Sequence, residues 1–103
     1  MKWLYLLTHM PGPGWEPGRS RMEQQGWQDH ADFMNALADS GFVVLGGPIS
    51  DTEALLAIDA GGEDEIRRVF EDDPWHINGV LTIKEIREWT ILLEHGVEHK
   101  LEQ

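Results

Sequence analysis

The stretch that decides the fold spans residues 41–62 and reads GFVVLGGPISDTEALLAIDAGG. Two largely apolar segments, residues 42–47 and 53–60, stand on either side of a turn that contains PISD. Short runs of β-branched and other apolar residues bounded by glycine and proline are typical of buried strands. The stretch therefore predicts two consecutive strands that belong to one sheet.

The residues before this stretch have the spacing of an amphipathic helix. From about residue 22 to residue 40, apolar side chains recur three and four positions apart, at Trp27, Ala31, Met34, Leu37 and Ala38. Gly41 follows, and glycine commonly ends a helix because it adopts the left-handed conformation without strain. The pattern predicts a first helix that ends at Gly41.

A second helix is predicted after the Gly-Gly pair that closes the stretch. Three acidic residues at positions 63–65 would occupy its first turn, where the helix dipole favours negative charge. Pro74 disfavours helical geometry at the residue before it, so we expect the helix to end at Asp73. Ile66, Phe70 and Asp73 would then lie on one inward face.

Two further strands and a loop complete the predicted order. Residues 2–8 (KWLYLLT) and 79–89 (GVLTIKEIREW) are strand-like, whereas residues 9–21 hold three prolines and three glycines and are predicted to be a loop. The order βαββαβ is that of a ferredoxin-like α+β sandwich, and 103 residues suffice for a single domain. We expect its core at about residues 1–90 and a C-terminal tail at residues 91–103.

Both faces of the predicted sheet are apolar. Two helices can cover only one face, and an antiparallel sheet with a wet second face should alternate polar and apolar residues. The strands instead carry apolar side chains at successive positions, for example in LYLL, VVL and ALLAI. We therefore expect a C2 homodimer packed sheet to sheet or, alternatively, a C-terminal tail that folds back over the second face.

Composition argues against several classes of partner. The 8 Lys and Arg against 19 Asp and Glu give a net charge of -11, which argues against nucleic acids and anionic membranes. The absence of cysteine excludes disulfides and thiolate zinc sites. No apolar run reaches the roughly 18 residues of a membrane span, and the apolar opening is too short for a signal peptide. We expect a cytoplasmic protein.

Three connections of this topology meet at one end of the sheet, namely residues 9–21, 46–51 and 72–79. His30 lies near the start of the first helix, on or beside its buried stripe, and Asp73 lies on the inward face of the second. A carboxylate bonded to one ring nitrogen fixes the tautomer of an imidazole and raises its basicity. We predict a catalytic pair here, with His30 as general acid/base and Asp73 orienting it.

The same end offers walls for a small-molecule ligand. Gly47 and Pro48 would let the backbone approach the ligand, and Trp15 or Trp75 would wall the pocket. Because the chain has neither cysteine nor a GxSxG motif, proton abstraction beside a carbonyl, elimination or isomerisation fits better than acyl transfer. The loop at residues 9–21 could serve as a lid.

Two other interpretations of these residues remain open. His9, His30, Asp73 and His76 could surround a metal ion, but no tight spacing such as HExxH supports one, and no metal or cofactor is predicted. The segment GPGWEPG likewise lacks the GK[ST] of a phosphate-binding loop. His30 and Asp73 could also form a structural hydrogen bond in a non-catalytic dimeric binding module.

Several of these segments together resemble a known family. HADFMNALADSGFVVLGGPI (residues 30–49), FEDDPWHINGV (70–80) and IREW (86–89) are similar to the pattern of the YCII-related (YciI-like) family. The resemblance implies a dimeric α/β barrel of ferredoxin-like subunits and a His–Asp site, carried here onto His30 and Asp73. One branch of that family eliminates chloride from chlorinated aromatics, so the resemblance also implies that lyase chemistry is conceivable here.

The sequence departs from the family pattern in two places. An arginine often stands three residues before the histidine, where this chain has Trp27, and the loop at residues 9–21 is longer than in compact members. A contact to an anionic substrate would then have to come from elsewhere. Arg19 or Arg21 in the loop could supply the positive charge.

Overall fold

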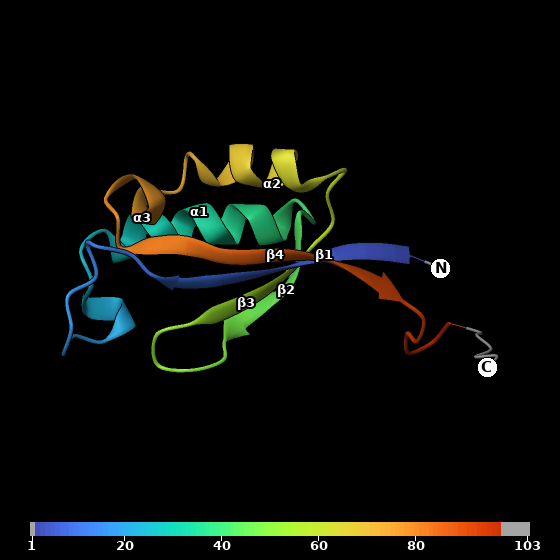
Figure 1. Cartoon of the computed structure of the whole chain (residues 1–103), viewed down its shortest axis with the longest axis horizontal. Helices are drawn as coiled ribbons and strands as arrows, with labels where there is room; N and C mark the ends of the chain where they lie inside the picture. Colours follow the sequence, from blue (N-terminus) through green and yellow to red (C-terminus); the bar gives the residue numbers. More distant parts are fainter. Residues whose placement is uncertain (1, 98–103) are drawn as a thin grey trace.

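Within residues 2–97, which the computed structural model describes, an antiparallel sheet of four strands forms one layer and helices form the other (Figure 1). The strands lie in the order β2-β3-β1-β4. Their bounds are Lys2–Pro11 for β1, Val43–Pro48 for β2, Ala54–Ile58 for β3 and Leu81–Ile91 for β4. With the helical crossovers, this order confirms the predicted ferredoxin-like α+β fold.

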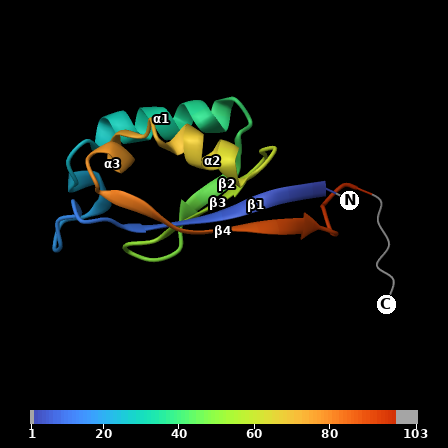
Figure 2. The same cartoon turned by 45° about the horizontal axis from the view of Figure 1, so that its top comes forward.

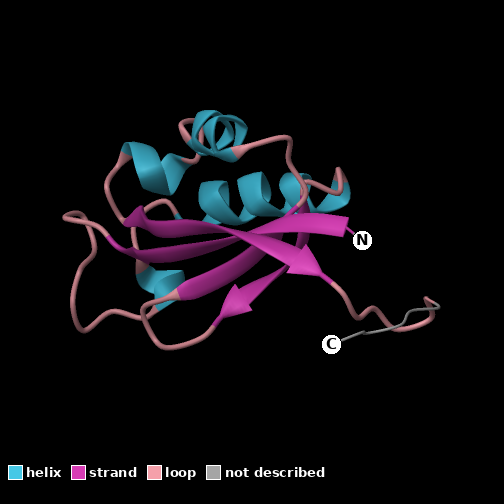
Figure 3. Cartoon of the chain, turned by 45° about the vertical axis from the view of Figure 1, so that its right-hand side comes forward, coloured by secondary structure: helices cyan, strands magenta, loops and turns pink. Residues whose placement is uncertain are grey.

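The helices pack on one face of the sheet, as Figures 1 and 3 show from two directions. They are α1 (Trp27–Asp39), α2 (Glu63–Phe70) and the short α3 (Pro74–Ile77), and a 3-10 turn, η1 (Arg21–Glu23), precedes α1. The core between the two layers is built from fully buried apolar side chains of both, among them Leu7, Ile58, Ile66 and Phe70.

The register of the central strand decides which side chains reach the helices. Leu7 of β1 pairs with Leu56 of β3 and Ile86 of β4, and all three pack in the core. His9 lies two residues further along, on the same side, because alternate residues of a strand face the same way. Its ring meets that of Phe70 edge-on, with 5.1 Å between the centroids. A histidine therefore lies in the core layer.

The observed boundaries differ from the predicted ones around the first loop. β1 continues to Pro11 and pairs with β4 along its length, so the prediction of a loop from residue 9 onward is wrong for its first residues. α1 begins at Trp27 rather than near residue 22, because Gly26 has a left-handed φ of 82° and separates α1 from η1. Hydrogen bonding to β4 outweighs the Pro/Gly content here.

The second helix ends earlier than predicted. α2 stops at Phe70, and Asp73 lies beyond it in an extended conformation that begins α3, a helix where the sequence predicts only a connection. β4 begins at Leu81 rather than at Gly79. Gly41, by contrast, has a left-handed φ of 85°, as expected of a residue that ends a helix.

The second face of the sheet is not covered by any helix of residues 2–97 (Figures 1 and 2). By register this face carries Leu4, Leu6, Leu45 and Trp89, since directly paired residues share a face. Leu45 is 69% exposed and Trp89 is 42% exposed. The homodimer expected to cover this face stays a prediction.

The chain continues past the sheet at its C-terminal end. Lys2 Nζ lies 3.1 Å from Glu94 Oε2, which ties the start of β1 to the segment after β4. Residues 98–103 of the predicted tail lie outside the described residues. In the described part of the chain, no helix is long and apolar enough to cross a membrane.

Candidate functional site

The first turn of α1 carries one imidazole of the site. His30 donates its backbone N–H to Gly26 O at 3.0 Å, which fixes it in the first helical turn. Its side chain points into the molecule, and the residue is only 7% exposed. The predicted position of His30 beside the buried stripe of the first helix agrees with this geometry.

Asp73 points inward for a reason other than the predicted one. It is the N-cap residue of α3, with φ -69° and ψ 121°, and its side chain accepts a hydrogen bond from Trp75 N. Pro74 occupies the first position of α3, where a proline costs no hydrogen bond. The helical stripe drawn through Ile66 and Phe70 therefore does not place Asp73; the cap does.

His30 and Asp73 meet in the interior. Nδ1 of His30 lies 2.8 Å from Oδ1 of Asp73, which is fully buried. Because the same Oδ1 also accepts the Trp75 N–H at 3.0 Å, the carboxylate is held from two sides. A carboxylate at Nδ1 places the ring proton there, so Nε2 of the neutral imidazole carries the lone pair.

Trp75 holds the imidazole in place. Its ring stacks on that of His30 with 3.9 Å between the centroids and 12° between the planes. The indole is itself fixed, because Trp75 Nε1 donates to Gln25 O at 2.8 Å. The base candidate therefore has both its tautomer and its ring plane defined by neighbouring groups.

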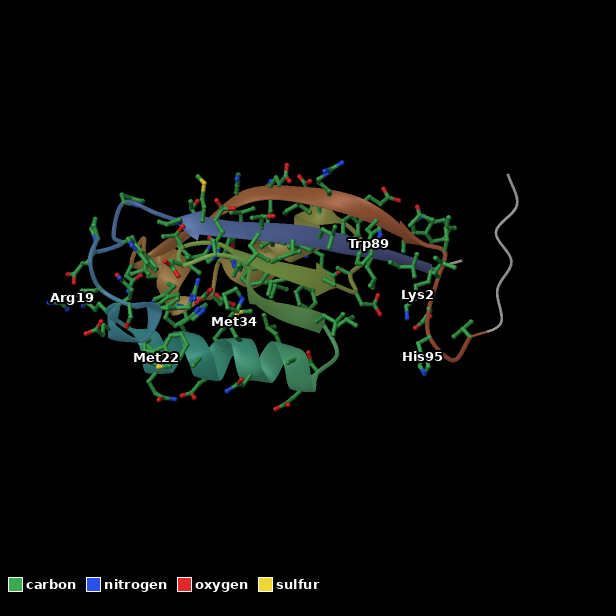
Figure 4. The ribbon with its side chains drawn as sticks, turned by 90° about the horizontal axis from the view of Figure 1, so that it is seen from below. Lys2, Arg19, Met22, Met34, Trp89 and His95 are labelled. Atoms are coloured by element: carbon green, nitrogen blue, oxygen red, sulfur yellow. The ribbon has the colours of Figure 1, made fainter. Side chains whose placement is uncertain are left out.

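A cavity of about 450 Å³ opens between α1 and the hairpin of β2 and β3. His30, Gly47, Pro48 and Trp75, four of the predicted site residues, line it. Most of the remaining wall is apolar and comes from α1 and the strands, with Trp27, Ala31, Met34, Ala38, Val43, Leu56 and Leu81 among the lining residues. Figure 4 shows Met34 between α1 and the sheet.

Trp15 does not line this cavity. It packs against Trp75, Val80 and Leu81 at the end of the molecule and borders a neighbouring hollow together with Arg19. Trp75 therefore lies at the candidate ligand site, whereas Trp15 packs against the cluster that contains Trp75 and does not line the cavity.

The loop between β1 and η1 is fastened at several points. Gly12 N and Gly14 N donate to Val80 O and Gly79 O at 3.0 and 2.8 Å. Gln24, only 2% exposed, accepts from Glu16 N and donates to the carbonyl oxygens of two loop residues. In this structure the loop is a fixed wall, and Gln24 is a residue that no motif in the sequence singles out.

The two loop arginines lie in different places. Arg19 forms an ion pair with Glu16 at 2.9 Å and lies at the outer end of the loop (Figure 4). Arg21 borders the cavity, and its Nη2 donates to Ser50 O and Asp51 O at 3.1 and 3.3 Å. The side chain of Arg21 thus joins η1 to the β2–β3 turn at the rim of the cavity.

Two further imidazoles, those of His9 and His76, lie next to the His30–Asp73 pair. His9 lines the cavity, and its Nε2 lies 2.9 Å from Nε2 of His76. Burial, followed by the neighbouring His76, lowers the pKa of His9 to about 3, and burial also lowers the pKa of His76. Both imidazole rings are therefore neutral near pH 7. Among residues 2–97, no three His, Asp or Glu side chains are arranged to hold a metal ion.

Comparison with known proteins gives a family and a similar fold. The model of the YCII-related domain matches residues 1–90 of the chain. A solved structure of 5-chloro-2-hydroxyhydroquinone dehydrochlorinase (TftG) from Burkholderia phenoliruptrix AC1100, in complex with 2,5-dihydroxybenzoquinone, superposes with a TM-score of 0.57. The two are 19% identical, over 89% of this chain and 95% of that one, so the likeness shows the fold alone. No curated protein matches the sequence.

Replacing Gln24 by alanine should loosen the loop wall. The substitution leaves the backbone groups of Glu16 without their buried partner, which typically costs about 1–3 kcal/mol of unfolding free energy. Amide hydrogen exchange at Glu16 should speed up, while Gln25→Ala, an exposed neighbour, should change neither quantity. Unchanged exchange at Glu16 in Gln24→Ala would show that the side chain does not fasten the loop.

Proposed function

Because this chain belongs to the YCII-related family, we propose that it is a small-molecule enzyme of the lyase or isomerase type that works by acid/base catalysis. The observation that carries the proposal is the 2.8 Å contact between His30 Nδ1 and Asp73 Oδ1 at the wall of a cavity. His30 is the general acid/base, and Asp73 is the residue that orients it.

The roles of the two residues follow from their protonation. With its proton on Nδ1, His30 keeps a lone pair on Nε2 and can take a proton from a ligand carbon next to a carbonyl. The imidazolium that forms is stabilised by the buried carboxylate at 2.8 Å. Trp75 keeps the ring plane fixed during the transfer, since it stacks on the imidazole at 3.9 Å.

The cavity favours a small and largely apolar ligand. Its volume of about 450 Å³ and its walls of aromatic and aliphatic side chains suit an aromatic or quinone-like molecule. The fold likeness to an enzyme that removes chloride from a hydroquinone supports an elimination. Gly47 and Pro48 form part of the wall, so their backbone would lie next to a bound ligand.

A non-catalytic binding module is the second candidate. One observation favours it, namely that Asp73 caps α3 through Trp75 N as well as bonding His30. In that case the His30–Asp73 bond joins α1 to the turn before α3 and serves stability alone. A buried pair of this kind typically costs about 3–5 kcal/mol when one partner is removed.

Screening quinones, hydroquinones and their chlorinated forms would identify a substrate, and substitution of either residue of the pair should then slow its turnover strongly. His30→Ala removes the base and Asp73→Asn removes the charge that orients it while keeping a side chain that caps α3, so each should lower kcat by about 10²–10⁴. Asp72→Asn, an exposed neighbour, is the matched control and should keep full activity.

Stability separates the two candidate functions. If the protein is an enzyme, Asp73→Asn should have a melting temperature close to that of the wild type, because active-site groups often oppose stability. Full turnover in both variants would contradict the catalytic assignment. A large loss of stability together with unchanged ligand binding would favour the binding module.

Arg21 is proposed as the contact for a ligand carboxylate or phenolate, since it borders the cavity and Arg19 does not. Phenylacetate and the neutral phenylacetamide make a matched pair of probes for NMR titration. Arg21→Gln should weaken phenylacetate binding roughly tenfold or more and leave phenylacetamide unaffected, since a hydrogen bond to a charged group is lost. Arg19→Gln should leave both affinities unchanged, and equal losses for both probes in Arg21→Gln would contradict the assignment.

A homodimer is proposed to cover the open face of the sheet. Light scattering should give about twice the chain mass of 11.7 kDa. Leu6→Glu places a charge at the centre of that face and should yield a folded monomer, because an unpaired charge cannot be buried without a large cost. Met22→Glu, at an exposed position of η1, should remain dimeric. A monomeric wild type would contradict the proposal.

A further inference from the structure

We propose that His9 is a second catalytic residue of this site, a hydrogen-bond donor to the ligand through Nδ1, with His76 and Asp73 as the positioning residues that place its proton there. The inference rests on the proposed function, because it assigns an electrophilic partner to the base His30. Both imidazoles line the same cavity, one from β1 and the other from α1.

His9 reaches the cavity from the centre of the sheet. Alternation along β1 turns His9 to the same side as Leu7, toward the helices, and its pairing with Ala54 of β3 is regular. His9 is only 1% exposed, and its ring contacts those of Phe70 and His76 at centroid distances of 5.1 and 4.9 Å. Although it is so deeply buried, His9 is one of the residues that line the cavity.

The nitrogen that His9 offers to a ligand is Nδ1. Nε2 is engaged, because it lies 2.9 Å from His76 Nε2. Among the described residues, Asp73 Oδ2 is the single fully buried side-chain oxygen or nitrogen without a hydrogen-bond partner. Nδ1 of His9 is therefore not sealed in the interior, although no protein group within residues 2–97 bonds to it.

Asp73 decides which of the two imidazoles donates. Its free Oδ2 lies 3.9 Å from Nε2 of His76, inside the protein, where charges interact strongly. A carboxylate at that distance favours a proton on the nitrogen that faces it and disfavours a lone pair there. His76 Nε2–H then donates to His9 Nε2, and neutral His9 must carry its own proton on Nδ1.

The charge state of His9 suits a donor rather than an acid. Burial and the neighbouring His76 lower its pKa to about 3, with a smaller opposing effect from Asp73. His76 opens on its outer side to a groove bordered by Arg67 and Glu71, and burial lowers its pKa as well. His9 thus stays neutral over the working pH range and can donate a hydrogen bond without giving up its proton.

The two imidazoles then have complementary roles in one step. His30 Nε2 takes the proton from a carbon beside a carbonyl, and the electron pair of that C–H bond forms a C=C bond while the π pair moves onto the carbonyl oxygen. The negative charge on this oxygen receives the hydrogen bond from His9 Nδ1–H, which stays on His9. A preorganised donor of this kind typically contributes about 10²–10³ in kcat.

The test is the tautomer of His9 in the free, full-length protein. Long-range 1H–15N spectra of the histidine rings, recorded from about pH 5 to 8, report directly which nitrogen carries the proton. The expected result is a neutral His9 with a protonated Nδ1 and a bare Nε2 that does not titrate. Asp73→Asn should reduce this preference, whereas Asp72→Asn should preserve it.

A His9 protonated at Nε2, or at both nitrogens within this pH range, would overturn the inference. Once a substrate is known, His9→Asn, whose amide nitrogen can take the place of Nδ1, should keep more of kcat than His9→Leu; equal losses would also overturn it. The outcome is separable from the proposed function. Loss of turnover in His30→Ala together with an Nε2–H tautomer of His9 would remove the role of His9 and leave His30 as the base.

Discussion

A buried carboxylate is the constraint on which the rest of the site depends. Asp73 has no exposed surface, yet only Oδ1 is hydrogen-bonded, to His30 and to Trp75 N, while Oδ2 has no partner among the described residues. Taking a carboxylate out of water costs several kcal/mol unless its environment compensates. The neighbouring groups are therefore arranged around this charge: a helix begins at it and two imidazoles lie beside it.

The two oxygens of Asp73 act on two different rings. Oδ1 lies 2.8 Å from Nδ1 of His30, and Oδ2 lies 3.9 Å from Nε2 of His76, which in turn contacts His9. Trp75 stacks on His30 at 3.9 Å. In the proposed mechanism, one side chain therefore orients both the base and the hydrogen-bond donor at the wall of the same cavity.

The fold could be predicted from the sequence because periodicity and glycine positions suffice for it. The predicted inward direction of Asp73 agrees with the structure, but the reason differed, since an N-cap places it and not the face of α2. The sequence does not predict α3, because a helix of four residues is too short for apolar residues to recur at helical spacing. The sequence predicts a loop at His9 because of the proline that ends β1 and the glycine after it, whereas the structure pairs His9 with the strand β4.

The candidate site could be predicted only in part, for a similar reason. Spacing along a helix directs His30 inward, and the family resemblance points to Asp73, so this pair was accessible from the sequence. The contact of His9 with His76 joins residues 67 positions apart and depends on tertiary packing, which no local pattern encodes. The sequence does not distinguish Trp15 from Trp75, and only the tertiary packing places Trp75, but not Trp15, on the cavity.

The most direct test of the account is the protonation of His30 itself. A 1H–15N spectrum of the neutral ring should show a proton on Nδ1, shifted downfield by its bond to a carboxylate, and a bare Nε2. Asp73→Asn should remove that downfield signal, because an amide cannot replace the negative charge. A wild-type His30 with its proton on Nε2 would contradict the account, since the nitrogen left to face the ligand would then have no lone pair with which to act as a base.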